Sequence, residues 1–435
     1  MMQEEQSAET ADKHRPAGCT ADRTGSYCCR VRRNVLGFFA EGANKSLVTA
    51  NPFQRCRVSR MKLKWAMTFL LTGAFFLVLY LWKDDYAVHV TKHLQVYARK
   101  NASQNRPPTT RSSYVYSWPS CQQNASAANI TGFTSLPGHI QDFLYHRHCR
   151  HFPMLLDVPD KCGGADKSVE VFLLLVIKSS PENYDRREVL RKTWANERLH
   201  NGMWIRRIFI SGTSGAGFEK QKLNKLLELE HREHNDILQW DFHDTFYNLT
   251  LKQILFLEWM ERNCPQARFL LNGDDDVFAN TDNMVDYLLS QKNNNGSKHL
   301  FAGYLIQHMG PTRNPESKYY IPVQVQKSDS YPPYCGGGGF ILSGYTAMVI
   351  YKMSKSITIL PIDDVYLGMC MVKAGLGPVS HMGMKIAGLA LPSNKLDVHD
   401  PCFYRDVLLV HRFLPPQIYL MWHRIHDPTL KCGPS

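Results

Sequence analysis

Three consecutive carboxylates, Asp274, Asp275 and Asp276, follow Asn272 and Gly273 at the end of an apolar strand-like segment in FLLNGDDDVF, residues 269–278. Adjacent negative charges repel one another, and on an exposed loop they would simply be solvated. Here apolar residues lie on both sides of the triplet, which indicates partial burial, and buried carboxylates need a cation. The pattern therefore predicts a site for a hard divalent ion, Mn²⁺ or Mg²⁺, and a diphosphate is the ligand that such an ion would naturally bind.

A second acidic pair, Asp363 and Asp364, lies in LPIDDVYLGMC, residues 360–370, before a segment of helical character. One of the two carboxylates could serve as a general base. Asp is also a favoured residue at a helix N-cap, where it needs no catalytic role. The sequence alone leaves both interpretations open.

Basic residues follow the apolar run of residues 169–177, in KSSPENYDRREVLRKTW, residues 178–194. Their side chains, or the start of the helix that carries them, could receive phosphate oxygens. Arg187 and Arg191 are one helical turn apart and would share a helix face. A solvated charged face is the alternative. The predicted donor-binding cations are Lys178, Arg187 and Arg191, with Arg186 in the same cluster.

The segment YPPYCGGGGFILS, residues 331–343, contains four consecutive glycines. Glycine permits positive φ and lets a ligand approach the backbone. Two tyrosines beside the glycines offer the flat faces on which proteins hold sugar rings. A tight crossover loop is the alternative. The residues predicted to bind an acceptor here are Tyr331, Tyr334, Gly337 and Gly338.

His411 ends an apolar, strand-like segment, VLLVHRF, near the C-terminus. A histidine in this position is either a metal ligand or a hydrogen-bonded core residue, and the core role is commoner in proteins generally.

The elements that must position these residues alternate between strand and helix. Residues 169–177 form a near-continuous apolar run, typical of a central parallel strand. The alternation predicts an α/β fold with an open, mostly parallel twisted sheet, and such sheets bind ligands at the carboxyl ends of their strands. The expected strands are 169–177, 204–210 and 269–271, and the expected helices are 186–194, 218–234, 249–262 and 281–290.

A membrane anchor is predicted near the N-terminus. Residues 65–82 form an uncharged run that nearly spans a hydrocarbon core, with a basic cluster before it and Asp84 and Asp85 after it. This arrangement predicts a type II topology with residues 1–64 in the cytosol, and a short anchor suits the Golgi membrane. Bulky residues at the end of the run argue against a cleaved signal peptide. Translation from Met61 is a further hypothesis.

Beyond the anchor, residues 83–132 are polar and rich in Pro and Ser, which predicts a lumenal stem. A catalytic domain, residues 133–435, follows it. Five N-glycosylation sequons open at Asn101, Asn124, Asn129, Asn248 and Asn295. Most of the cysteines beyond the anchor should be paired in disulfide bonds rather than bind a metal, because no zinc spacing occurs among them. These eight cysteines are Cys121, Cys149, Cys162, Cys264, Cys335, Cys370, Cys402 and Cys432.

Composition excludes several classes of protein. A chain of 435 residues, 44% hydrophobic and 21% charged, can bury a core and is neither disordered throughout nor a disulfide-stapled mini-protein. The net charge of +12 suits a membrane surface or an anionic small molecule. Nucleic-acid binding would explain the charge but neither the anchor nor the carboxylates.

Taken in order, RREVLRKTW, DDDVF, YPPYCGGGGFILS, IDDVYLGMC and LLVHRF resemble the β-1,3-glycosyltransferase family of β-1,3-galactosyl- and β-1,3-N-acetylglucosaminyltransferases. The resemblance covers residues 133–432. Residues 143–162 look like a segment of the N-acetylglucosaminyltransferase branch, and the chain is most similar to its type 3 and type 7 members. The resemblance implies a GT-A fold, an inverting mechanism, a UDP-sugar donor and Mn²⁺.

Residue by residue, the resemblance implies that Asp276 and His411 bind Mn²⁺ and that Asp274 and Asp275 lie near the donor. Asp364 would be the base, with Asp363 as the second choice. The base would act on the 3-hydroxyl of a terminal β-galactose that attacks UDP-GlcNAc, which makes the chain a hexosyltransferase.

Several alternatives stay open. A β-1,3-galactosyltransferase using UDP-galactose would keep the same site, whereas a silent relative that only binds glycans would be expected to lose the carboxylates. Poly-N-acetyllactosamine, sulfated keratan-type chains and mucin core 1 all suit the acceptor role. The sequence also leaves the assembly open, with a homo-oligomer and a complex with other glycosyltransferases as alternatives.

Overall fold

A computed structural model describes residues 120–336, 338–386 and 400–433. The predicted anchor at residues 65–82, the stem up to residue 119, Asn101 and Gly337 all lie outside these ranges. None of the helices in the three ranges combines the length and the apolar character that crossing a bilayer requires.

Four parallel strands form the middle of a nine-stranded sheet, in the order β5, β4, β2, β6. The apolar run predicted to be a central strand is β2, and all of its residues are buried. Its side chains alternate between two hydrophobic cores, because Leu174 and Val176 belong to one and Leu173 and Leu175 to the other. The four strands are β5 (Ile237–His243), β4 (Met203–Thr213), β2 (Val171–Lys178) and β6 (Phe269–Asp274).

The outer strands make the sheet mixed rather than mostly parallel. On one side β1 pairs antiparallel with β5, on the other β11 pairs antiparallel with β6 and β8, and β3 pairs antiparallel with β4. The expectation of a mostly parallel sheet therefore holds only for its centre. These strands are β1 (Met154–Leu156), β3 (Arg198–His200), β8 (Phe301–Gly303), β11 (Gly339–Ser343) and β12 (Val379–Ser380), which pairs parallel with β8.

Two small sheets complete the strand pairing. One joins β9 (Leu305–Ile306) to β10 (Tyr334–Cys335), and the other joins β13 (Met384–Lys385), β14 (Leu409–His411) and β7 (Val277–Ala279). In the second of these sheets, the pairing of β14 with β7 brings His411 next to the segment that follows β6.

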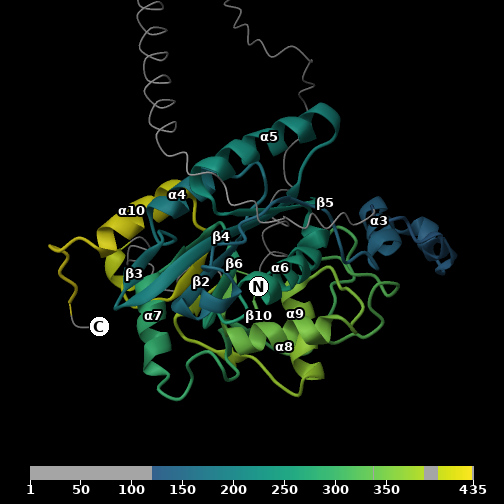
Figure 1. The fold of residues 1–435 in the computed structure, drawn as a ribbon. Coiled ribbons are helices and arrows are strands. Elements are labelled where there is room, and N and C mark those ends of the chain that lie inside the picture. The colour runs from purple at the N-terminus through teal and green to yellow at the C-terminus, as the bar shows by residue number, and fades with distance from the viewer. Residues whose placement is uncertain (1–119, 337, 387–399, 434–435) are drawn as a thin grey trace, which may run out of the picture. The chain divides into compact units, whose positions relative to one another are not determined.

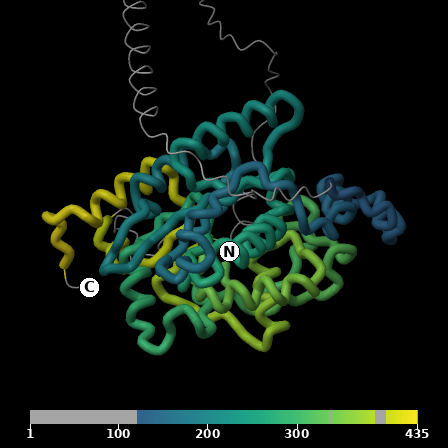
Figure 2. The backbone as a smooth tube through the Cα atoms, in the orientation of Figure 1, coloured from purple at the N-terminus to yellow at the C-terminus, as the bar shows by residue number. Residues whose placement is uncertain are grey.

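Helices cover both faces of the central sheet (Figure 1). One face packs against α6 (Leu249–Asn263), α8 (Gly344–Ser354) and α9 (Asp363–Lys373), and α3 (Gly138–His146) joins the same hydrophobic core. The other packs against α4 (Tyr184–Lys192), α5 (Gly217–His234), α7 (Thr281–Ser290) and α10 (Pro415–Ile425). The yellow C-terminal helix α10 lies beside α4 (Figure 2). The structure confirms all four predicted helices and all three predicted strands, with shifted ends, whereas β5 and the antiparallel edge were not predicted.

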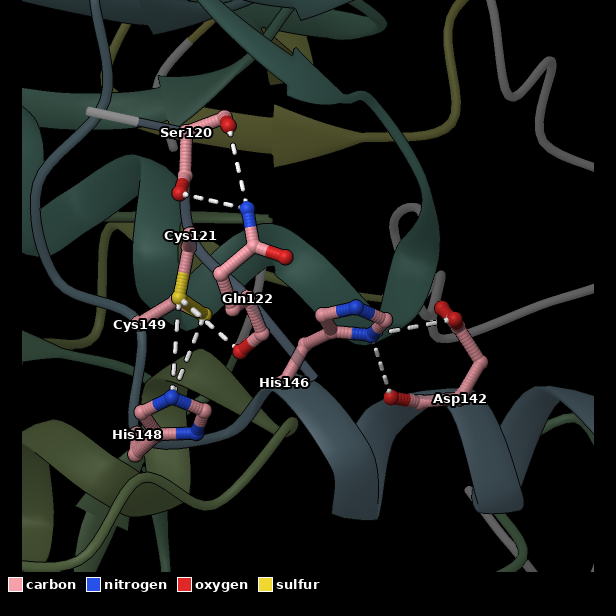
Figure 3. The surroundings of a disulfide bond; sticks show 7 residues. All are labelled: Ser120, Cys121, Gln122, Asp142, His146, His148 and Cys149. Carbon is pink, nitrogen blue, oxygen red and sulfur yellow. Dashed lines mark hydrogen bonds and ion pairs between the residues drawn. A yellow bond between two sulfur atoms is a disulfide. The ribbon is translucent and has the colours of Figure 1, made fainter. Parts of the chain in front are cut away.

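Three disulfide bonds link six of the eight cysteines beyond the predicted anchor, in agreement with the expected pairing. The two remaining thiols are buried, and burial raises the pKa of each to about 12, so they are not reactive nucleophiles. The ring of His148 lies beside the Cys121–Cys149 bond (Figure 3), but both sulfur atoms are used in the disulfide and cannot also be thiolate metal ligands. The other bonds are Cys162–Cys264 and Cys402–Cys432, and the free thiols are Cys335 and Cys370.

Candidate active site

The acidic triplet begins at Asp274, the last residue of β6, and His411 is brought to it by strand pairing. β14 pairs with β7 so that His411 is opposite Val277, the residue after the triplet. Nε2 of His411 lies 3.2 Å from a carboxylate oxygen of Asp276 and 3.8 Å from one of Asp274. Asp274, Asp276 and His411 each offer one ligand atom, and these atoms lie within 4.8 Å of one another. We call this set the metal cluster.

The chemistry of these donors fits a divalent cation. Two carboxylate oxygens and one imidazole nitrogen suit Mn²⁺, which accepts both ligand types. Burial raises the pKa of Asp274 to about 6, even though Lys178 acts in the opposite direction. Burial acts on Asp276 too, but its hydrogen bond and charge interaction with His411 hold its pKa below the usual value. A cation would stabilise both carboxylates in their charged form.

The glycine run allows β11 to pack closely against the metal cluster. A Cβ atom at Gly338 would lie 2.8 Å from Cβ and Cγ of His411, and one at Gly339 would lie 3.2 Å from the carbonyl oxygen of Asn272. Gly339 also has a φ of +157°, which disfavours other residues. Gly338 is buried, so the structure gives it a role in positioning His411 and does not fit the predicted contact with an acceptor.

Lys178 connects the metal cluster to the second acidic pair. It is the last residue of β2 and lies in register with Asp274 on β6. Its ammonium group lies 3.0 Å from Asp274 and 2.9 Å from Asp363, with only 4% of the side chain exposed. Burial alone would lower the pKa of Lys178, but the two carboxylates raise it above its usual value. Lys178 is therefore a permanent cation that fixes the two acidic groups relative to each other.

Asp363 and Asp364 are the first two residues of α9, and the N-cap is Ile362. Neither aspartate is the N-cap residue, so the alternative interpretation of the pair does not apply. Asp363 is held by Lys178 and lies 3.4 Å from the amide nitrogen of Gln253. Asp364 accepts a hydrogen bond from the backbone of Val365, and burial together with the charge of Asp363 raises the pKa of Asp364 to about 7. A carboxylate with such a pKa is poised to take up a proton.

Asp275 points away from the metal cluster and toward α4. Its carboxylate accepts hydrogen bonds from Asn183 at 2.9 Å and from Arg186 at 3.1 Å. Burial raises its pKa, whereas hydrogen bonds from Ser179 and Asn183 act to lower it. Asp275, predicted to bind the donor, therefore acts on the site through Arg186, which reaches toward Asp276 at 3.8 Å.

Arg187 and Arg191 do not face the site. Nε of Arg187 donates to Glu230 at 2.8 Å, and its other nitrogens donate to residues 179–181. Arg191 pairs with Glu230 at 2.7 Å and with Asp236 at 2.9 Å. Both guanidinium groups are buried beneath α4, whereas binding the donor would require them to be accessible at the site. The prediction that Arg187 and Arg191 bind the donor therefore does not fit the structure.

The two tyrosines of the glycine-rich segment lie near the second acidic pair. Their rings meet edge to face with centroids 6.5 Å apart. Burial raises the pKa of both phenols, and the charge of Asp364 acts in the same direction on each. Gly368 of α9 permits this proximity, because a Cβ atom there would lie 2.7 Å from the carbonyl oxygen of Pro333. Tyr331 and Tyr334 thus adjoin Asp364, although Tyr334 is almost fully buried at 6% exposure.

A buried amide pair behind the site was not predicted. Gln253 of α6 and Asn272 of β6 exchange two hydrogen bonds of 2.7 Å, which tie α6 to the strand that leads into the triplet. Arg186, a member of the basic cluster, is a further residue that the structure places at the site. A sequence signal existed for Asn272, whose polar side chain interrupts an apolar strand. None existed for Gln253, because its partner is distant in sequence.

Among the sequons in the described ranges, Asn124, Asn129 and Asn295 are exposed. Asn248 is half-buried before α6 and donates a hydrogen bond to the carbonyl of His243, while Thr250 of the same sequon is fully buried. The first three positions therefore offer accessible side chains, and Asn248 is held by the fold.

Comparisons with known proteins give one consistent result. Residues 185–382 match the model of the galactosyltransferase family. The chain is 54% identical to human N-acetyllactosaminide β-1,3-N-acetylglucosaminyltransferase 3, over 72% of the chain and 82% of the relative. It is 49% identical to human acetylgalactosaminyl-O-glycosyl-glycoprotein β-1,3-N-acetylglucosaminyltransferase, over 72% of the chain and 81% of that relative. It is 40% identical to mouse UDP-GlcNAc:βGal β-1,3-N-acetylglucosaminyltransferase 7, over 72% of the chain and 77% of that relative.

Proposed function

The chain belongs to the galactosyltransferase family, and from this membership we propose that it is a β-1,3-N-acetylglucosaminyltransferase. It transfers GlcNAc from UDP-GlcNAc to the 3-hydroxyl of a terminal galactose on a glycan. The named relatives support GlcNAc as the sugar, and the structural observation that carries glycosyl transfer is the position of the metal cluster next to the acidic pair Asp363 and Asp364, with Lys178 between them. A diphosphate-binding site and a proton acceptor side by side suit glycosyl transfer.

The mixed sheet, with the triplet at the end of β6, supports a GT-A fold. Asp274, Asp276 and His411 would hold Mn²⁺, with Asp274 joining the two ligands expected from the sequence. When bound, the ion supplies positive charge to the diphosphate as it departs.

Asp364 is the better candidate for the base. Asp363 is paired with Lys178 in a buried setting, which fixes its position. Burial and the charge of Asp363 raise the pKa of Asp364 to about 7, so Asp364 is suited to accept a proton. It takes the proton from the acceptor hydroxyl while that oxygen attacks the anomeric carbon from the face opposite UDP. The linkage formed is therefore β.

The cellular setting belongs to the same proposal. An anchor at residues 65–82 would hold the enzyme in the Golgi membrane in type II orientation, with the described domain in the lumen. Disulfide bonds and exposed sequons are compatible with an oxidising, glycosylating compartment.

A donor and acceptor panel tests the proposal. The full-length protein in detergent with Mn²⁺ is given UDP-GlcNAc or UDP-galactose, together with lactosamine, sulfated lactosamine, core 1 or a GalNAc-bearing peptide. GlcNAc transfer to a galactose-terminated acceptor is expected. Transfer to GalNAc would instead align the chain with the relative named for acetylgalactosaminyl-O-glycosyl-glycoprotein. Galactose transfer, or no transfer at all, would contradict the proposal.

A further inference from the structure

Four basic residues follow β2, and the structure gives them unequal surroundings. Lys178, Arg187 and Arg191 have 5% or less of their side chains exposed, and each is paired with a buried carboxylate, that of Asp363, Glu230 or Asp236. Arg186 keeps 30% of its side chain exposed and lies at the metal cluster. Of these four residues, Arg186 is therefore the cation that a ligand at the metal cluster can reach.

Arg186 is held firmly on one side and loosely on the other. Its Nη1 donates to Asp275 at 3.1 Å, and Asp275 is itself fixed by Asn183 and has only 7% of its side chain exposed. The same Nη1 lies 3.8 Å from Asp276, beyond hydrogen-bond distance. In the described part of the chain, Nε and Nη2 of Arg186 have no hydrogen-bond acceptor. Two donors of the fork are thus available for a ligand.

We propose that Arg186 binds the diphosphate of the UDP-sugar and exchanges its loose pairing with Asp276 for the phosphate oxygens. This inference rests on the proposed function and adds a residue to it. Asp275 keeps its hydrogen bond throughout and sets the direction of the guanidinium. A cation in the metal cluster would compete with Arg186 for Asp276, so filling the cluster favours the exchange.

The exchange places positive charge where the reaction needs it. As the bond between the anomeric carbon and the phosphate oxygen breaks, its electron pair stays on the phosphate oxygen, and the acceptor proton passes to Asp364. Negative charge on the diphosphate therefore increases in the transition state. A planar guanidinium with two available donors suits phosphate oxygens better than a lysine does.

Calorimetry with UDP and UMP tests the inference on the full-length protein in Mn²⁺. Arg186→Gln should raise the Kd for UDP about 10- to 100-fold, the range expected for losing charge-assisted hydrogen bonds, and should raise the Kd for UMP less. Arg186→Lys should keep part of the affinity for UDP. The matched control is Arg206→Gln, because Arg206 has 32% of its side chain exposed and lies over the Trp204 ring. This control should bind UDP like the wild type.

A different outcome would overturn the inference. If Arg186 only neutralises the acidic triplet, Arg186→Gln would bind Mn²⁺ more tightly and bind UDP as the wild type does. Thermal unfolding of each variant separates loss of binding from loss of folding, and Arg186→Lys keeps the charge if the Gln variant unfolds. Failure of the wild type itself to bind UDP would contradict the proposed function instead.

Discussion

At the scale of single residues, the division of work between Asp363 and Asp364 is open to a direct test. Asp364→Asn removes the proposed proton acceptor but keeps the size of the side chain and leaves Lys178 with both of its partners. Transfer should fall about 10²- to 10⁴-fold, the contribution typical of a positioned general base. The Kd for UDP should stay within about threefold of the wild type, since the metal cluster is untouched. Equal loss of transfer and of UDP binding would make Asp364 a structural residue.

The raised pKa of Asp364 also predicts a dependence on pH. The base must be deprotonated, so transfer should decline as the pH falls through about 7. The stability of the fold should change with pH in the opposite direction, because the pKa of Asp364 in the folded protein exceeds its unfolded value of about 3.9. The contribution of Asp364 to the free energy of unfolding is full below about pH 4 and is lost as the pH rises through about 7. Asp364→Asn should therefore be more stable than the wild type at pH 8 but not at pH 4, as measured by urea unfolding.

At the scale of elements, the ion pairs under α4 join this helix to α5 and β4. Arg187 is 1% exposed and pairs with Glu230, while Arg191 and Arg207 share Asp236. Removing one partner of a buried pair leaves a charge without compensation, which costs about 3 to 5 kcal/mol.

Arg187→Leu should therefore lower the free energy of unfolding by about that amount, at the low end because Arg191 also contacts Glu230. The Kd for UDP of the folded fraction should not change, the reverse of the pattern expected for Arg186→Gln. Urea unfolding and calorimetry on the same samples measure both quantities. A loss of UDP affinity without a loss of stability would restore Arg187 to the donor site.

The end of α10 is attached to α7 through Asp282, which contacts Arg198, His200 and His426. Burial by itself would raise the pKa of Asp282, but the interactions with His426 and Arg198 lower this pKa to about 2. The hydrogen bond to Asp282 raises the pKa of His426. His200 contacts a second carboxylate besides that of Asp282, which belongs to Asp286.

These shifts define the pH range in which the attachment stabilises the fold. The part due to Asp282 is present above about pH 4 and is lost as the pH falls through about 2, whereas the part due to His426 is present below about pH 6.5 and is lost as the pH rises through its folded pKa. Asp282→Asn should therefore lower the melting temperature more at pH 5.5 than at pH 8. An equal decrease at both values would show that protonated His426 contributes nothing.

The local sequence pattern was enough to predict those elements whose own residues show an apolar run or an apolar helical spacing. The apolar run of β2 and the helical segments of α6 and α7 are examples. Strand β5 was missed because Gln239 and Asp241 interrupt its apolar residues. The antiparallel β11 and the approach of β14 to β7 depend on pairing between distant segments, which no local pattern encodes.

The same limit explains which site residues were predicted. Residue type and setting marked the acidic triplet, the pair Asp363 and Asp364, and His411 as candidates, but only the resemblance to the family assigned roles to Asp276, His411 and Asp364. The spacing of Arg187 and Arg191 showed that they share a helix face, but not that this face meets Glu230 and Asp236.

At the scale of the whole molecule, β2 and β6 end together, and α9 begins beside them. β14 adds His411 from the C-terminal part of the chain. Four segments far apart in the sequence thus converge on one edge of the sheet, as expected for ligand binding at the carboxyl ends of parallel strands. The reaction depends on this convergence rather than on any single motif.

The product of the reaction is the most direct test of the proposed activity. Full-length protein, Mn²⁺, UDP-GlcNAc and a galactose-terminated acceptor are incubated, and the product is analysed by NMR for its linkage and anomeric configuration. We expect one new GlcNAc residue in β configuration on O3 of galactose, and no product when EDTA is present. An α linkage, attachment at another hydroxyl, or full activity in EDTA would contradict the proposed roles of the metal cluster and of Asp364.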